Sequence, residues 1–177
     1  SSAASDVYKR QRIHIYRVEE EPRWILTHAY NVGLRRCNND IVLKLDNDHS
    51  ITRDFFSANP LTKNIDARIG SWRLAPNPDQ AYINGAFMCR SETLRNIGYF
   101  NELITTYGWD DSYLHESLFS DGASIAYLDP KTISHIEQEE SSRTASQSVS
   151  LEERLASSVD KRVTEFMNRR NMYLTSV

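Results

Sequence analysis

The stretch from Asp40 to His49 constrains this chain most, because a short apolar run in it ends abruptly in acidic residues. Ile41, Val42, Leu43 and Leu45 form a short apolar run rich in β-branched side chains, the composition of a buried strand. Asp46-Asn47-Asp48 follows and places two carboxylates and an amide at the carboxyl end of that strand, the edge where open α/β sheets bind ligands. Carboxylates so close together suit a hard divalent cation such as Mg²⁺ or Mn²⁺. The alternative is a polar loop that only caps the strand, since such short motifs are common by chance.

The composition is that of an ordinary globular domain. The chain has 177 residues, of which 40% are hydrophobic and 25% are charged, and its net charge is -3. The sequence has no basic stripe, so we do not expect nucleic acid as a partner. It also has no apolar run of membrane-spanning length and no visible signal peptide. Cys37 and Cys89 are too far apart for a disulfide framework or a zinc knuckle, and we expect a reducing, cytoplasmic location.

The two ends of the chain differ in pattern from its middle. Asp6–Gln11 resembles the translation of a transposon end used in sequencing libraries, so we expect residues 1–11 to be a non-native tail, with a genuine disordered tail as the alternative. Residues 12–137 form the expected core. Residues 138–150 are rich in Ser, Glu and Gln without periodicity and predict a mobile loop. Residues 151–177 begin with the pattern of an amphipathic helix.

Alternating strand and helix patterns predict an α/β sheet in the core. The predicted strands are 12–18, 41–45, 67–74, 80–89, 125–128 and 132–136, and the predicted helices are 19–37, 52–56, 92–97 and 109–121. This architecture brings strand ends and helix starts to one edge of the sheet. Asp46-Asn47-Asp48, Asp110-Asp111 at the start of a helix, and His135 at the end of a late strand would therefore converge.

Four segments, in this order, resemble a GT-A-fold glycosyltransferase. They are Ala29–Leu34, Asp40–Asp48, Asn84–Arg90 with Ile97–Glu102, and Tyr107–Leu114. The first two are similar to the middle of that fold, the third to its acceptor-side motif and the fourth to its Gly-Trp-Glu-Asp catalytic segment. The most similar families are glycosyltransferase family 2 and the C-terminal domain of animal galactosyltransferases. Several motifs in register are a stronger signal than any one alone. The resemblance implies a mixed central sheet flanked by helices.

The resemblance also implies a metal-dependent, inverting transfer of a sugar from a nucleotide-diphosphate donor, with a UDP-sugar expected. Asp46 and Asp48 of the DXD motif, together with His135, would hold Mn²⁺ or Mg²⁺. Asp111 would be the general base, and Asp110 would orient the acceptor. Simpler readings of the residues stay open. His135 can be a core or loop histidine, and Asp110-Asp111 can be favourable charge at a helix N-terminus.

The remaining site residues follow from the same resemblance. Asn31 and Asn47 would contact the donor. The pocket for a saccharide or other hydroxyl acceptor would be lined by Asn84, Gly85, Tyr107 and Trp109, because aromatic faces stack on sugar rings. Core packing is the alternative for Trp109. Lys44 and Arg90 are expected either near phosphate or, equally well, at the surface.

The chain departs from the family pattern at several positions. Asp110 stands where Glu is usual, and the acid near Tyr113 and the arginine near Ser117 are absent. The first strand and helix of the family, which grip the nucleotide base, would precede residue 12, so we expect an N-terminally truncated domain. Two other functions stay open: a nucleotidyltransferase on a related sheet, and a degenerate sugar-binding domain without turnover.

Overall fold

The computed structural model describes residues 14–19, 25–104 and 109–136. The helices are α2 (Leu26–Leu34), α3 (Phe55–Ala58), α4 (Ser91–Asn96) and α5 (Asp110–Ser120), and the 3-10 helices are η1 (Trp72–Leu74) and η2 (Pro78–Gly85). The strands are β1 (Ile41–Lys44), β2 (His49–Ile51), β3 (Ala67–Ile69), β4 (Phe87–Arg90), β5 (Ile125–Tyr127) and β6 (Ile133–His135). None of the described helices is long and apolar enough to cross a membrane.

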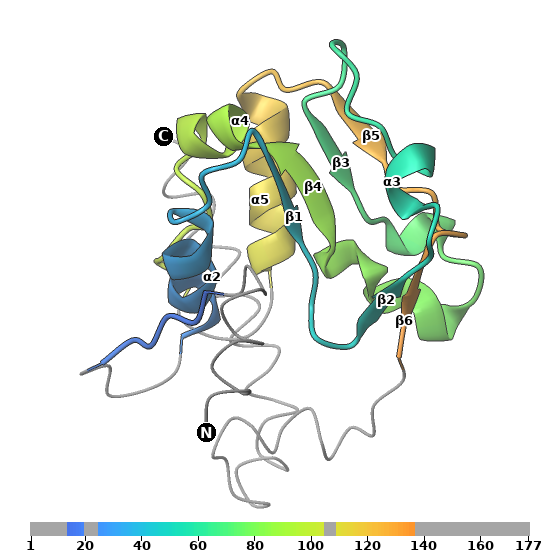
Figure 1. Ribbon diagram of the computed structural model, residues 1–177, viewed down its shortest axis with the longest axis horizontal. Coiled ribbons are helices and arrows are strands. Elements are labelled where there is room, and N and C mark those ends of the chain that lie inside the picture. Colours follow the sequence, from blue (N-terminus) through green and yellow to red (C-terminus); the bar gives the residue numbers. More distant parts are fainter. Residues whose placement is uncertain (1–13, 20–24, 105–108, 137–177) are drawn as a thin grey trace, which may run out of the picture.

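A mixed four-stranded sheet, ordered β1-β4-β3-β5, forms the centre of the fold (Figure 1). β4 pairs antiparallel with both of its neighbours, and β3 pairs parallel with β5. β2 and β6 form a separate antiparallel ribbon beside this sheet, with His49 directly opposite His135. The α/β class, the mixed sheet and the flanking helices confirm the fold predicted from sequence.

Side chains alternate between the two faces of the sheet, and each face has its own core. On one face, Val42 and Phe87 pack with Leu114 and Leu118 of α5. Figure 1 shows α5 crossing behind β1 and β4. The core of the other face contains Phe55, Ile83, Ala86, Leu128 and Ile133, with Leu43 and Leu45 packed against it. Because residues 42, 44 and 46 share a face, the end of β1 is directed toward the start of α5.

The strand predicted at 12–18 is wrong over its described part. Residues 14–19 are irregular, and the side chain of Ile15 is 82% exposed. An alternating pattern is not sufficient for a strand, because the backbone N–H and C=O groups need a neighbouring strand. In the described part of the chain no strand pairs with this segment.

The strands predicted at 67–74 and 80–89 are shorter than expected. β3 ends at Ile69 and β4 begins at Phe87, with η1 and η2 between them. The Asn77 side chain accepts a hydrogen bond from the Gln80 N–H and begins η2, so the turn chemistry of Pro76–Asp79 extends well into the predicted strand. Asn84 and Gly85 consequently end a 3-10 helix instead of lying within a strand.

The bounds of α4 and α5 are close to those predicted, whereas α2 ends at Leu34 instead of residue 37 and α3 begins at Phe55 instead of residue 52. α4 and α5 begin close to Ser91 and Asp110, and glycines with positive φ, Gly98 and Gly122, follow them. Thr52 does not cap α3, since the N-cap is Asp54 and the Thr52 hydroxyl donates to its carboxylate at 2.6 Å. Phe119 near the end of α5 is 79% exposed, whereas Leu114 and Leu118 of the same helix are buried. The tail at 1–11, the loop at 138–150, the helix from 151 and the start of the helix at 19–24 fall outside the described residues.

Candidate active site

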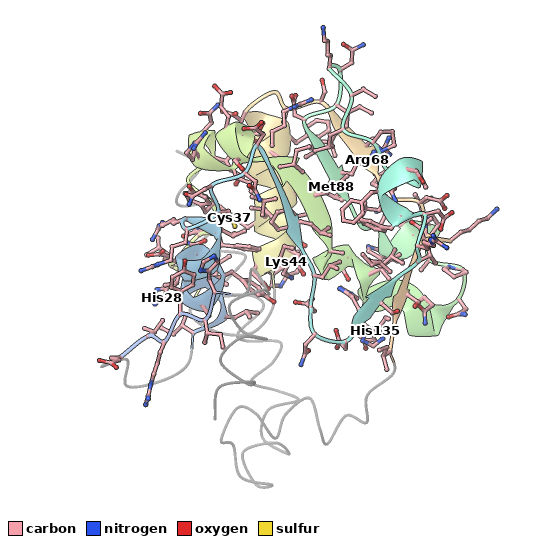
Figure 2. The ribbon with its side chains drawn as sticks, viewed as in Figure 1. His28, Cys37, Lys44, Arg68, Met88 and His135 are labelled. Atoms are coloured by element: carbon pink, nitrogen blue, oxygen red, sulfur yellow. The ribbon has the colours of Figure 1, made fainter. Side chains whose placement is uncertain are left out.

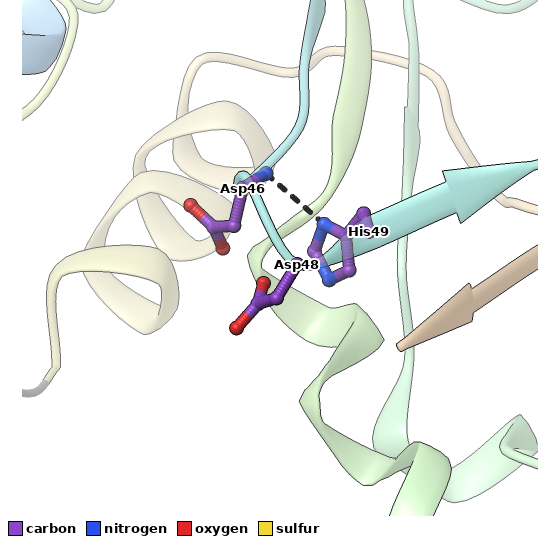
Figure 3. Close-up of side chains that lie close together, drawn as sticks. All are labelled: Asp46, Asp48 and His49. Atoms are coloured by element: carbon purple, nitrogen blue, oxygen red, sulfur yellow. Dashed lines mark hydrogen bonds between the residues drawn. The ribbon is translucent and has the colours of Figure 1, made fainter. Parts of the chain in front are cut away.

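A tight turn at the end of β1 holds the acidic motif in place. The His49 N–H donates to the Asp46 carbonyl at 3.1 Å, and the Asp46 N–H donates to His49 Nδ1 at 3.1 Å (Figure 3). Because Nδ1 accepts, the other ring nitrogen carries the proton and donates to the Tyr82 carbonyl at 3.3 Å. Asp46, Asp48 and His49 each offer one ligand atom, and these atoms lie within 4.8 Å of one another. The turn therefore places the carboxylate oxygens of Asp46 and Asp48 close enough together to bind one cation.

His135 joins this turn from the neighbouring strand of the ribbon. Its Nε2 lies 3.3 Å from Asp48 Oδ2. The His135 backbone N–H donates to Gln80 Oε1 at 2.6 Å, and Gln80 Nε2 donates to the His135 carbonyl at 3.0 Å. The side chain is 3% exposed, and its Nδ1 is buried without a hydrogen-bond partner among the described residues. A buried ring nitrogen left without a partner costs free energy, so a ligand at this histidine is a physically reasonable expectation. Carboxylates combined with imidazole fit Mn²⁺ or a similar divalent ion.

Asp46 is held in its ionised form by two donors. Lys44 Nζ lies 2.9 Å from Asp46 Oδ1, and the Tyr30 hydroxyl donates to the same oxygen at 2.6 Å. Burial by itself would raise the pKa of this carboxyl, but the Lys44 charge and the Tyr30 hydrogen bond hold it below its ordinary value. Burial and then the Asp46 charge raise the pKa of Tyr30, which therefore stays a neutral donor.

The second carboxylate pair stands at the N-terminus of α5. Trp109, the residue before this helix, has φ 68 in the left-handed region, a conformation that costs a bulky residue about 1–2 kcal/mol. Burial, opposed by the backbone N–H groups of Asp110 and Asp111, raises the pKa of Asp110. Burial and then the Asp110 charge raise the pKa of Asp111 to about 7. Asp111 Oδ1 is 3.9 Å from Lys44 Nζ, so the same lysine forms ion pairs with Asp46 and with Asp111.

Gly85 lets the two pairs approach each other. A Cβ at this position would lie 2.5 Å from Asp46 Oδ2 and 3.5 Å from Asp111 Oδ2. Its carbonyl accepts a 2.7 Å hydrogen bond from Lys44. The acidic cluster therefore packs closely against the Gly85 backbone, where any side chain would occupy the space of a carboxylate.

Most of the predicted site residues lie around this cluster. Asn47 is exposed in the turn, and Asn84 and Trp109 are half-buried beside Gly85 and Asp110, respectively. Tyr107 lies outside the described residues.

Asn31 requires a correction. It is fully buried, and its amide bonds to the Phe100 backbone and to Glu102 at 2.8–3.0 Å, so it has no exposed atom with which to contact a donor.

Three residues of the cluster were missed in the sequence. Lys44 was expected at the surface or near phosphate, yet it is 7% exposed. Its position in the strand pattern, two residues after Val42 and two before Asp46, was a usable signal for the face it shares with them. His49 follows the acidic motif directly, and this position was a signal that its side chain could hydrogen-bond back to the turn, as it does to the Asp46 N–H. Tyr30 had no local signal, because its contact with Asp46 depends on how α2 packs.

Comparisons with known proteins find similarity in structure but not in sequence. No protein-family model matches the chain, and no curated protein sequence matches it. Two structures of the Drosophila β1,4-galactosyltransferase 7 catalytic domain are similar, each at 16% sequence identity. One, a complex with xylobiose, has a TM-score of 0.53 over 68% of this chain and 54% of that domain. The other, a mutant complexed with manganese, UDP-Gal and xylobiose, has a TM-score of 0.57 over 86% of this chain and 69% of that domain.

At this identity the likeness concerns the fold. The chain spans 54% of the length of the first of these domains, so it corresponds to a part of that structure. The order of strands and helices, with an acidic turn after β1 and an acidic start to α5, agrees with the resemblance found in the sequence. The chain has the GT-A glycosyltransferase fold.

Proposed function

We propose that this chain carries the metal and acceptor half of an inverting glycosyltransferase, which transfers a sugar from a nucleotide-diphosphate donor to an acceptor hydroxyl. One observation carries the proposal: a carboxylate with a pKa near neutrality, Asp111, stands beside a turn that holds Asp46 and Asp48, with the His135 ring 3.3 Å from Asp48. The fold shared with a galactosyltransferase that was crystallised with manganese, UDP-Gal and xylobiose supports this assignment.

Asp111 is suited to take the proton of the acceptor hydroxyl. A general base works best when its pKa lies near the working pH, and burial has moved this group there. As Asp111 takes the proton, the acceptor oxygen attacks the anomeric carbon. The bond from that carbon to the diphosphate oxygen breaks, and its electron pair leaves with the diphosphate. A single displacement of this kind inverts the anomeric configuration.

The turn at the end of β1 provides the site for the cation. Asp46 and Asp48 would hold Mn²⁺ or Mg²⁺, with His135 as the third ligand, because its ring is not committed on both nitrogens as that of His49 is. A cation there supplies charge neutralisation for the leaving diphosphate. Asp46 remains ionised at neutral pH because Lys44 and Tyr30 stabilise its charge.

The test is UDP release from a panel of UDP-sugars, UDP-Gal first, with Mn²⁺ and saccharide acceptors that include xylobiose. Turnover should require Mn²⁺ and stop with EDTA. Asp111→Asn should lower it by about 10²–10⁴-fold, the usual contribution of a general base. The matched control is Asp121→Asn, an exposed carboxylate just after the same helix, which should leave turnover unchanged.

The proposal would be overturned if Asp111→Asn kept full turnover. Donor binding without turnover by the unmodified chain, across the whole panel, would favour the non-catalytic sugar-binding domain instead.

A further inference from the structure

A buried lysine stands between the two carboxylate pairs, and the mechanism above gives its ammonium no role beyond holding Asp46. Lys44 is the last residue of β1, and its side chain is 6% exposed. Figure 2 shows it directed from β1 toward the start of α5. A buried ammonium is costly unless it is paired and hydrogen-bonded, so its partners indicate what it does.

The partners come from four separate elements. Nζ donates to the Gly85 carbonyl at 2.7 Å and lies 2.9 Å from Asp46 Oδ1 and 3.9 Å from Asp111 Oδ1. It also sits 4.3 Å from the centre of the Tyr30 ring, a cation–π contact. One ammonium therefore links the acidic turn, the end of η2, the start of α5 and helix α2. No other described lysine or arginine forms an ion pair with these carboxylates.

This arrangement has a consequence for a divalent cation. Asp46 Oδ1 already carries two donors, Lys44 and Tyr30, and Asp46 Oδ2 faces Gly85. A cation that binds Asp46 must share or displace the ammonium, and the two positive charges repel each other at such short range. Among the described residues, the same ammonium is also the only lysine or arginine nitrogen that forms an ion pair with Asp111.

We propose that Lys44 is a positioning residue that competes with the divalent cation for Asp46 and is shared between Asp46 and Asp111 when the cation is absent. Cation binding at Asp46 then loosens the hold of the ammonium on that carboxylate, and Lys44 turns toward Asp111. Occupancy of the cation site is thereby coupled to the charge that faces the general base. This inference deepens the proposed function and rests on it in one respect, that Asp46 and Asp48 take a divalent cation.

The test is a titration of Mn²⁺ against the wild-type chain and two variants, with free Mn²⁺ measured by electron paramagnetic resonance and no donor present. Lys44→Met removes the charge and keeps the length of the side chain, and it should bind Mn²⁺ about tenfold more tightly, since a competing and repelling charge is gone. Lys44→Arg keeps the charge and should bind as the wild type does. A merely structural lysine predicts the opposite, weaker Mn²⁺ binding by Lys44→Met.

A second variant tests the same carboxylate oxygen without removing a charge. Tyr30→Phe removes the other donor on Asp46 Oδ1 without changing the charge, and it should alter Mn²⁺ affinity by less than threefold. The wild-type protein also reports directly: the ¹⁵N signal of the Lys44 ammonium, assigned by its loss in Lys44→Arg, should shift when Mg²⁺ is added. A signal that does not respond to a saturating concentration of Mg²⁺, or equal or weaker Mn²⁺ binding by Lys44→Met, would overturn the inference.

The two proposals fail separately. A wild-type protein that shows the Lys44 effect on Mn²⁺ binding but transfers no sugar would remove the glycosyltransferase assignment and keep the role of Lys44. A protein that transfers sugar with Mn²⁺, while wild type, Lys44→Met and Lys44→Arg bind the ion equally, would do the reverse. No binding of Mn²⁺ by any of the proteins would overturn both.

Discussion

Two pairs of aspartates lie only a few ångströms apart, and the pKa values of Asp46 in one and Asp111 in the other are shifted in opposite directions. At the end of β1, the Lys44 ammonium and the Tyr30 hydroxyl outweigh burial and keep the pKa of Asp46 low. At the start of α5, burial and the charge of Asp110 outweigh the same lysine, 3.9 Å away, and raise the pKa of Asp111 to about 7. Asp46 is therefore held in its charged form, as a cation ligand must be, and Asp111 can exchange a proton near neutral pH.

This difference shows that surroundings and not residue type assign the roles of the four aspartates, as when two carboxylates of one active site are given separate tasks. The turn of Asp46 and Asp48 lies at the end of a strand and is braced by backbone and imidazole hydrogen bonds. Asp111 lies at a helix start that follows a residue with positive φ, so its position depends on a backbone conformation that is unfavourable by itself. Three changes, from the largest expected effect to the smallest, can break or sharpen the comparison.

The largest effect is expected at the histidines beside the turn. His135→Ala should lower Mn²⁺ affinity by about 10–100-fold or more, since it removes a proposed ligand. His49→Ala should lower it less, because this ring orients the turn through its bonds to Asp46 and to the Tyr82 carbonyl. Calorimetric titration of Mn²⁺ measures both. The reverse ranking would make His49 the ligand and His135 the supporting residue.

Gly85→Ala should have the next largest effect. Its new Cβ would lie 2.5 Å from Asp46 Oδ2, so the carboxylate must move and Mn²⁺ affinity should fall by about tenfold, with a loss of roughly 1–3 kcal/mol in stability from overpacking. The control is Gly33→Ala in α2, where a Cβ meets nothing within 4 Å and the helix should gain about 0.5–1 kcal/mol. Unchanged Mn²⁺ binding in Gly85→Ala would mean that Asp46 is not held where the structure places it.

The smallest effect is a dependence of stability on pH in the metal-free protein. The Asp111 carboxyl has a pKa of about 7 when folded and an ordinary value of 3.8, so between about pH 4 and pH 7 the folded state binds more protons than the unfolded state. Stability from this group therefore falls as pH rises through that window. Asp111→Asn carries no such cost, and its melting temperature should exceed that of the wild type increasingly from pH 5 to pH 8, by about 2–4 °C for each kcal/mol of relief.

Asp121→Asn is again the control for that series, and its difference from the wild type should not vary with pH in the same way. A difference between Asp111→Asn and wild type that is constant, or that narrows toward pH 8, would show that burial does not raise the pKa of Asp111. The two aspartate pairs would then not differ as described above.

The sequence predicted the elements that carry the acidic residues, because local signals define them. The apolar run before Asp46 marks β1, and Gly122 after the apolar spacing of Leu114 and Leu118 marks the end of α5. The mixed sheet followed from the alternation of these elements and from the resemblance to GT-A enzymes. Contacts made between elements were harder to predict.

Lys44 illustrates this limit, because a lysine in a strand is usually surface-exposed and only the packing of α2, η2 and α5 around it provides its partners. The pairing of His49 with His135 likewise depends on the register of a ribbon whose strands are more than eighty positions apart in the sequence. Asn31 was assigned to the donor because of its motif, and a buried amide network uses it instead. Pattern and motif thus indicated the acidic residues of the proposed site, and three-dimensional packing sets the opposite pKa shifts of Asp46 and Asp111.

The most direct measurement is thermal unfolding with Mn²⁺ and UDP added together, for wild type, Asp48→Asn and Asp111→Asn. Ligands that bind the native state raise the melting temperature by mass action. We expect Asp48→Asn to lose the rise and Asp111→Asn to keep it, because we propose the first aspartate as a cation ligand and the second as the general base. A rise that survives in Asp48→Asn, or that is lost equally in both variants, would contradict the division of the four aspartates into a cation-binding pair and a basic pair.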